Sequence, residues 1–379
     1  MILIVGVFLI FGFYGIARAQ NVEPTPAVGS VASAPTSTDV VPEDPRKKMI
    51  LLPLLYYTPE TKFAAGAFFV KNFWKEKEGH SSHLIGAVSL SMNNQVIVSL
   101  APKLYFDQGD WDVNGGLFYS YNPSKYYGRS VLTAAPSFES YVENTFLVSA
   151  GLGKNIFSHF FIRGGIAQDS RKISDYEAGG LIAGEVTNLA QSIEVQSAIA
   201  TFEWDERDYP QAPRQGSWYR ISHTFFSPRD REGYRELARF RKSDFDLRQY
   251  FLFKEKFTGA LQFQMAEMQG DQIPFQYLNG IGGGSRMRGY YNGQYRDKSI
   301  SLAQAEFRYD FKPNWVGTLF SGVARLGPRL QELEAADSFY SSGFGVHYIL
   351  DPENRTKLRL DLGFTGKETG FYFLIGEAF

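Results

Sequence analysis

The side chains best suited to chemistry in this chain of 379 residues are its five histidines, one pair of aspartates and the residues around a run of glycines. Asp205 and Asp208 could hold a metal ion, but Arg207 lies between them and favours internal ion pairing. The glycines at 282–284 lack the Lys-Ser/Thr of a phosphate-binding loop. The histidines lack the helical spacing with Asp or Glu that marks metal sites; they are His80, His83, His159, His223 and His347.

These patterns predict a protein that is not an enzyme and uses no cofactor or metal. The chain has no cysteine, which excludes disulfides, thiolate metal sites and cysteine nucleophiles. No Gly-x-Ser-x-Gly motif marks a nucleophile. One catalytic alternative stays open, a Ser/His hydrolase assembled across strands, in which His347 would share a strand face with Gly343 and Gly345. The formal net charge of -1 gives no case for nucleic acid as a partner.

From Met49 onward the hydrophobic pattern has a period of two, which indicates strands with one apolar and one polar face. In FTGALQFQM (257–265), Leu261 and Phe263 alternate with Gln262 and Gln264. The stretches HLIGAVSLSM (83–92) and KLRLDLGF (357–364) repeat the pattern. Such strands build either a soluble sandwich with its apolar faces inward, or a membrane barrel with its apolar faces outward and a polar lumen.

Three features favour the membrane barrel. An apparent signal peptide comes first, the polar strand faces carry small and charged residues, and the chain ends on an alternating strand that we expect to run to its last residue. This C-terminus resembles the C-terminal signal of outer-membrane barrels, through Phe371, Phe373, Ile375 and Phe379. We therefore expect an all-β protein, a transmembrane antiparallel barrel of about sixteen strands, in the outer membrane of a Gram-negative bacterium.

The sequence divides into three parts. Residues 1–19 form a long apolar run that ends in Ala17-Arg18-Ala19, typical of a signal peptide, with an uncleaved anchor helix as the alternative. Residues 20–48 are rich in Pro, Thr, Ser and Ala and predict a disordered periplasmic linker. Residues 49–379 predict the barrel, with short periplasmic turns and longer extracellular loops, among them 270–298.

The stretch GIGGGSRMRGYYNGQYRDKSISLAQAEFRYDF (280–311) resembles the sixth extracellular loop and following strand of BamA/TamA-type outer-membrane barrels, the bacterial surface antigen family. These barrels carry an Arg-Gly-Tyr/Phe tripeptide in the loop and a Glu-x-Arg pair on the strand. The matching positions are Arg288, Gly289 and Tyr290 in the loop, and Glu306 and Arg308 on the strand.

Two further stretches resemble the same family. LYYTPETKFAAGAFF (55–69) is similar to its first hairpin. The second stretch, FEWDERDYPQAPRQGSWYR (202–220), resembles the family's D-x-R-D-x-x-x-x-P-x-x-G periplasmic turn. The matching positions are Asp205, Arg207, Asp208, Pro213 and Gly216. The plainer interpretation is a charged periplasmic turn without any further role. The resemblance covers 49–379, and the family's periplasmic POTRA domains have no counterpart before residue 49.

Strand alternation over 300–311 places Glu306 in the lumen, where an unpaired carboxylate is costly. A loop folded into the barrel could bring Arg288 to it as a bidentate partner, so we expect an inward loop tethered by this pair. The family often has an aspartate on the next strand, in a pattern like F-x-D-x-G. Gly322 stands at that place, so a single carboxylate partner is expected. The alternative is a solvated surface loop whose tyrosines serve adhesion.

The resemblance implies a barrel that inserts β-barrel proteins, or moves polypeptide or lipid across the outer membrane. In the family this uses a seam between the first and last strands, here about 50–57 and 371–379, with Gly376 as a candidate weak point. The implied partners are outer-membrane lipids, unfolded client proteins and a separate periplasmic partner. The main alternative is a passive porin-like channel or structural protein, in which lumen charges tune ion selectivity; these would be Lys103, Glu306, Arg359 and Asp361.

Overall fold

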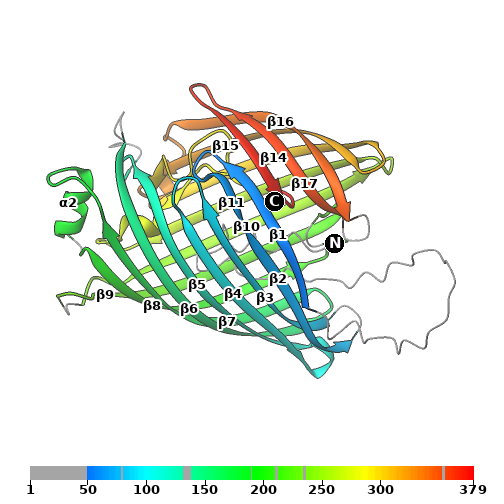
Figure 1. Cartoon of the computed structure of the whole chain (residues 1–379), viewed down its shortest axis with the longest axis horizontal. Helices are drawn as coiled ribbons and strands as arrows, with labels where there is room; N and C mark the ends of the chain where they lie inside the picture. The colour runs from blue at the N-terminus through cyan, green and yellow to red at the C-terminus, as the bar shows by residue number, and fades with distance from the viewer. Residues whose placement is uncertain are drawn as a thin grey trace.

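The computed structural model describes residues 49–77, 80–130, 138–188, 190–209, 212–233, 236–351 and 355–379. Within these residues, sixteen strands follow one another around a closed barrel (Figure 1). Each strand pairs with its neighbours in antiparallel fashion. The prediction of a sixteen-stranded antiparallel barrel is thus confirmed. The predicted signal peptide (1–19) and linker (20–48) lie outside the described residues.

The barrel strands are β1 (Met49–Thr58), β2 (Lys62–Lys77), β3 (His80–Ser91), β4 (Val96–Phe106), β5 (Trp111–Tyr126), β6 (Glu139–Phe157), β7 (Phe160–Ser174), β8 (Ser192–Asp205), β9 (Gly216–Asp230), β10 (Phe240–Phe253), β11 (Phe257–Gln269), β14 (Ser299–Lys312), β15 (Trp315–Gly327), β16 (Ser338–Asp351), β17 (Thr356–Phe364) and β18 (Thr369–Ile375). A small separate pair, β12 (Asn279–Gly280) and β13 (Arg296–Asp297), lies within the long connection between β11 and β14.

The two faces of the wall differ as the alternation predicts. On β11, Leu261 and Phe263 are exposed on the outside, whereas Gln262 and Gln264 are buried on the inside. An apolar outer face fits lipid, and a polar inner face fits a lumen. The inward charges are paired along the wall, which offsets the cost of removing them from water. Arg163, for example, lies 3.3 Å from Asp112 and 3.1 Å from Glu203.

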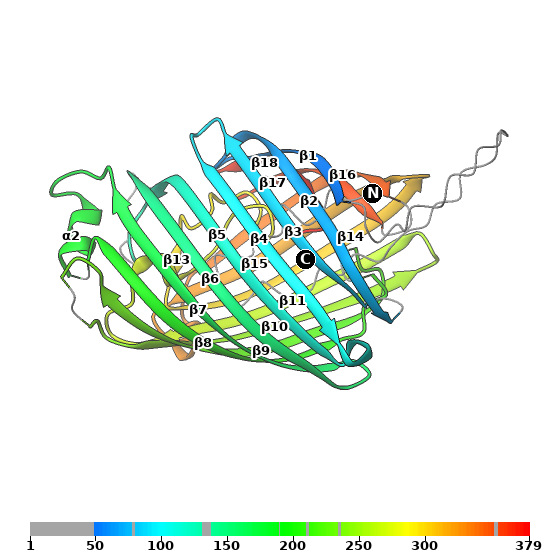
Figure 2. The ribbon, with the colours of Figure 1, turned by 60° about the horizontal axis from the view of Figure 1, so that its bottom comes forward.

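Connections at the two ends of the barrel differ in length. One end has short turns, such as the one between β14 and β15, and the other has longer loops (Figure 2). The short helix α2 (Leu181–Asn188) lies beyond the strand ends on the side of the long loops. Among the described residues, no helix has the length and apolar character needed to cross a membrane.

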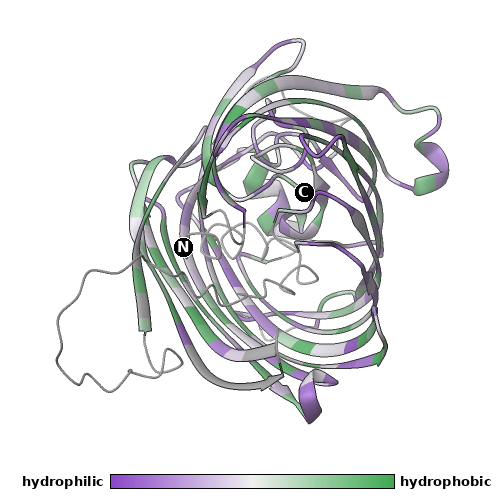
Figure 3. Ribbon diagram, turned by 90° about the vertical axis from the view of Figure 1, so that its right-hand side faces the viewer, coloured by the Kyte–Doolittle hydropathy of each residue, from purple (hydrophilic) through white to green (hydrophobic). Residues whose placement is uncertain are grey.

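The C-terminal strand is shorter than the sequence suggested. β18 ends at Ile375, because Gly376 adopts a left-handed backbone conformation with φ of +87°. The last residues leave the wall, and a view along the barrel shows the C-terminus inside the ring of strands (Figure 3). The expectation that the strand runs to Phe379 is therefore wrong. Phe371 is exposed on the outer face, but Ile375 and Phe379 are buried.

Candidate functional site

The candidate site is built around the connection 270–298, which we call the inward loop. It folds back into the barrel against the wall. Sharp turns need glycine at two of its positions. Gly282 has φ of +108°, and a Cβ there would lie 2.3 Å from the carbonyl oxygen of Tyr291. Gly289 has φ of +117°, and a Cβ there would lie 2.9 Å from the side chain of Thr365.

Arg288, at the tip of the inward loop, is paired with two carboxylates of the wall. It is 2% exposed, and its guanidinium donates to Glu306 on β14 and, at 2.6 Å, to Asp361 on β17. The guanidinium carbon also lies 3.4 Å from the ring centroid of Phe320 on β15. The structure therefore brings Arg288 to Glu306, together with a second acid. Charge-assisted bonds from two strands hold the loop tip against this part of the wall.

The second carboxylate corrects the expectation drawn from Gly322. A Cβ at Gly322 would lie 2.9 Å from the sulfur of Met287, so a loop side chain occupies the space of an aspartate there. Asp361 supplies the acid from β17 instead, two strands further along the wall. The sequence does contain the D-x-G part of the F-x-D-x-G pattern, but on a later strand than expected. Asp361 precedes Gly363 by two residues in the alternating stretch Leu360–Phe364.

Gly289 and Tyr290 complete the contact of the tripeptide with the wall. The amide of Gly289 donates to the hydroxyl of Tyr372 on β18 at 2.9 Å, and the hydroxyl of Tyr290 donates to the carbonyl of Tyr340 at 3.1 Å. Close backbone approach also depends on Gly363, where a Cβ would lie 2.5 Å from the carbonyl carbon of Arg288. The loop tip thus lies on β16, β17 and β18 without intervening side chains at its closest point.

Arg308 joins three separate parts of the chain inside the lumen. Its Nε lies 2.7 Å from Glu306, and its other nitrogens donate to the carbonyl of Pro213 at 3.1 Å and to Phe379 at 3.2 Å. It also lies 3.6 Å from Glu377. Burial alone would raise the pKa of Glu377, but Arg308 and Lys357 hold that pKa below its usual value. The C-terminal tail is therefore bound to the wall as an anion.

The turn between β8 and β9 keeps its shape through its own side chains. The guanidinium of Arg207 lies 2.6 Å from the carboxylate of Asp205, as the sequence pattern favoured over a metal. The carboxylate of Asp208 accepts hydrogen bonds from the backbone amides of Tyr209, Arg214 and Gln215. Gly216 has φ of +101°, and a Cβ there would lie 2.2 Å from the carbonyl oxygen of Glu206. Through Pro213 the turn meets Arg308, so two of the motifs meet in space.

His347 faces the lumen but is placed poorly for hydrolysis. Its Nε2 is shared between Asp361 at 2.9 Å and the hydroxyl of Thr318 at 3.3 Å, while Nδ1 lies 3.8 Å from Glu377. A nucleophile–histidine–acid relay needs the hydroxyl and the acid hydrogen-bonded to opposite ring nitrogens. Glu377 is too far from Nδ1 for a hydrogen bond, so among the described residues that nitrogen has no acid bonded to it. The histidine is also fully buried. Its geometry fits a member of the ion network around Arg288 and Arg308.

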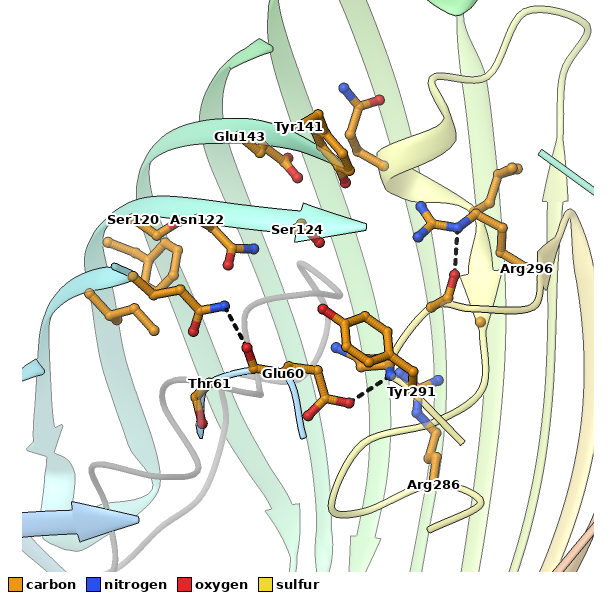
Figure 4. A pocket seen from close by; sticks show the side chains of 18 residues that line it. Glu60, Thr61, Ser120, Asn122, Ser124, Tyr141, Glu143, Arg286, Tyr291 and Arg296 are labelled. Atoms are coloured by element: carbon orange, nitrogen blue, oxygen red, sulfur yellow. Dashed lines mark hydrogen bonds between the residues drawn. The ribbon is translucent and has the colours of Figure 1, made fainter. Parts of the chain in front are cut away.

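A cavity of about 120 Å³ separates the inward loop from the wall on the side of the β1–β2 turn, β5 and β6 (Figure 4). Its lining mixes polar and apolar side chains and includes the charged residues Glu60, Glu143, Arg286 and Arg296. The carboxylate of Glu60 accepts the backbone amide of Asn292 at 2.7 Å. Burial raises the pKa of Glu60, because the hydrogen bonds that it accepts, the one from Asn292 foremost, do not fully replace water. The inward loop therefore also contacts the first hairpin of the barrel.

The barrel closes between β1 and β18 through a narrow seam. Tyr57 and Phe373 are the Cα partners that join these strands. By contrast, β1 pairs with β2 along its whole length, from Met49–Lys71 to Thr58–Lys62. An apolar cluster covers the lumen side of the seam; it consists of Leu54, Tyr56, Ala64, Tyr372, Leu374 and Ile375. The predicted seam segments therefore meet at one ladder position, and Gly376 lies just beyond the last strand.

Comparison with known proteins gives a consistent fold assignment. A family model for the Omp85 superfamily domain matches residues 84–379. The structure is similar to BamA from Haemophilus ducreyi lacking POTRA domains 1–3, with a TM-score of 0.62 and 14% identity over 87% of this chain and 70% of that chain. It is also similar to CdiB from Acinetobacter baumannii, with a TM-score of 0.54 and 11% identity over 86% of this chain and 59% of that chain. CdiB from Escherichia coli gives a TM-score of 0.55 and 8% identity over 89% and 64% of the two chains. Comparison with curated proteins gives no match.

Proposed function

Because the chain belongs to the Omp85 superfamily, we propose that it inserts β-barrel proteins into the outer membrane, or moves polypeptide or lipid across it, by opening the seam between β1 and β18. The chain is an outer-membrane barrel of a Gram-negative bacterium. Omp85 barrels are insertion or transport proteins. The observation that carries the proposal is the seam itself, where β1 and β18 meet at the pair Tyr57–Phe373.

A weak seam is the place where exchange of strands costs least. Unpaired backbone N–H and C=O groups are costly inside a bilayer, so every other strand pair of the wall resists opening. Parting β1 from β18 sacrifices few hydrogen bonds and exposes two strand edges. Such an edge is a template for pairing with a strand of another chain. In this proposal an unfolded client adds its strands at the seam and leaves into the surrounding lipid.

The proposed partners follow from this mechanism. Lipid contacts the apolar outer face, and the client contacts β1, β18 or both. A separate periplasmic protein, or the segment 20–48, would deliver the client to the end of the barrel that carries the short turns. The geometry around the C-terminal tail supports a closed resting barrel, because Glu377 and Phe379 are bound inside the lumen.

A disulfide across the seam tests the proposal. Directly opposite residues of antiparallel strands have Cα atoms about 4.5–5.5 Å apart, within the range that a disulfide spans. We would introduce Tyr57→Cys with Phe373→Cys, reconstitute the protein in liposomes and follow the folding of a denatured small barrel protein by gel shift. The matched control is Ile162→Cys with Phe202→Cys, an outward pair of partners between β7 and β8.

The expected result is that the barrel accelerates client folding, that oxidation of the seam pair abolishes the acceleration, and that reduction restores it. Oxidation of the control pair should leave the acceleration intact. Equal acceleration with the seam locked would rule out opening at β1 and β18. Absence of acceleration over a porin, with steady ion conductance through the same vesicles, would favour the passive channel instead.

A further inference from the structure

The inward loop touches both sides of the seam within four consecutive residues. On the β18 side, the amide of Gly289 donates to the hydroxyl of Tyr372 at 2.9 Å, and that hydroxyl donates to the carbonyl of Tyr290 at 3.4 Å. On the β1 side, the amide of Asn292 donates to Glu60 in the β1–β2 turn at 2.7 Å. Both wall residues are buried, with Tyr372 at 0% and Glu60 at 7% exposure.

We propose that residues 289–292 form a clasp across the seam from the lumen, and that Glu60 and Tyr372 are its two anchors. They are positioning residues that set how readily β1 parts from β18. The inference rests on the proposed function, because a clasp matters only if the seam opens. Strand pairing at Tyr57–Phe373 is too short to account for closure alone, so the contacts made from inside contribute a substantial share of the resistance to opening.

The β18 side of the clasp is the more firmly held. Besides Tyr372, Gln294 donates to Glu368 in the β17–β18 loop at 2.7 Å, and Arg359 on β17 donates to the carbonyl of Gly284 at 2.9 Å. Arg288 adds its ion pair with Asp361 on the same side. These bonds tie the loop to β17 and β18 as one unit.

The β1 side depends on Glu60. The bond from the amide of Asn292 to Glu60 links the inward loop to the first hairpin. The other carboxylate oxygen of Glu60 is buried without a hydrogen-bond partner in the described parts of the chain. A buried carboxylate with one unsatisfied oxygen is a cost in the closed state. The clasp should therefore release at Glu60 first, while the loop stays on β18.

Hydrogen exchange measures seam opening directly and independently of any client. In lipid nanodiscs, Glu60→Ala should raise the exchange rate of β1 and β18 amides about fivefold, the effect of losing one buried hydrogen bond. Tyr372→Phe removes a hydroxyl with two hydrogen bonds to the loop and should raise that rate at least as much. Amides of β7 and β8 should not change. Glu60→Gln keeps a carbonyl oxygen that can accept from Asn292, so its exchange should stay near that of the unaltered protein. Tyr126→Phe, which removes the hydroxyl of a buried tyrosine on β5 that is bonded to Glu185, is the matched control outside the inward loop and away from the seam.

Each outcome separates the clasp from the proposed function. Unchanged exchange at β1 and β18 in both anchor variants would overturn the clasp, as would an equal increase in Tyr126→Phe. Faster exchange at the seam with unaltered client folding would support the clasp and count against insertion through the seam. Loss of client folding on seam locking, with normal exchange in the anchor variants, would support the function and refute the clasp.

Discussion

The arginine at the tip of the inward loop gives the sharpest test of the site. We would replace Arg288 by Met, which keeps most of the aliphatic volume against Phe320 but removes the charge. The substitution leaves Glu306 and Asp361 buried without their shared partner. Breaking a fully buried ion pair costs about 3–5 kcal/mol, because the remaining charge is left uncompensated.

The cost should fall near the lower end of that range, about 3 kcal/mol, because each carboxylate keeps another cation. Glu306 retains Arg308 at 2.7 Å, and Asp361 retains Arg359 at 3.2 Å. With an entropy of unfolding of about 2 cal/mol/K per residue, a loss of this size lowers the unfolding temperature of a barrel of this length by roughly 4 °C. The assay is the temperature at which the folded band converts to the unfolded band on a gel.

The matched control is Arg286→Met, two residues earlier in the same loop. Arg286 lines the lumen cavity, and within the described ranges no hydrogen bond or ion pair is made by its side chain, which Asp244 and Asp246 attract only at longer range. Its substitution should leave the unfolding temperature within about 1 °C, as for most changes that break no buried interaction. A shift of the same size in both variants, or no shift in Arg288→Met, would refute the claim that the paired arginine holds the loop.

Two other substitutions test the contact of the loop with the wall. Gly363→Ala should loosen the loop and lower the unfolding temperature on the same gels, because the added Cβ would lie 2.5 Å from the carbonyl carbon of Arg288. The control Gly366→Ala adds a Cβ that meets no atom within 4 Å, so it should be neutral. Equal unfolding temperatures in the two variants would contradict the close approach of the loop to Gly363. Glu306→Arg should destabilise the barrel, because it removes the acid that lies between Arg288 and Arg308. Adding Arg288→Glu should not restore stability, because the new glutamate would face Asp361. Full recovery in the double variant would mean that Asp361 is not a partner of Arg288.

The strands and their faces were predictable because their cause is local. Alternation with a period of two assigns each side chain to lipid or lumen without knowledge of any other strand, so Glu306, Arg308 and Asp361 could all be placed in the lumen in advance. Long loops and short turns followed from composition in the same way. The error at the C-terminus is also local in origin, since the alternating pattern itself gives no sign that Gly376 turns the chain inward.

Apart from Glu306 as a partner of Arg288, which the sequence suggested, the partners within the lumen were decided by the tertiary structure alone. Arg288 and Asp361 are 73 residues apart in the sequence, and Glu60 and Asn292 are 232 apart. Whether such residues meet depends on the tilt and stagger of the strands around the whole barrel, which alternation within one strand does not encode. The same holds for the seam. The sequence determined which strands come first and last, but closure of the ring decided that they meet at Tyr57 and Phe373, and that one loop reaches both from inside.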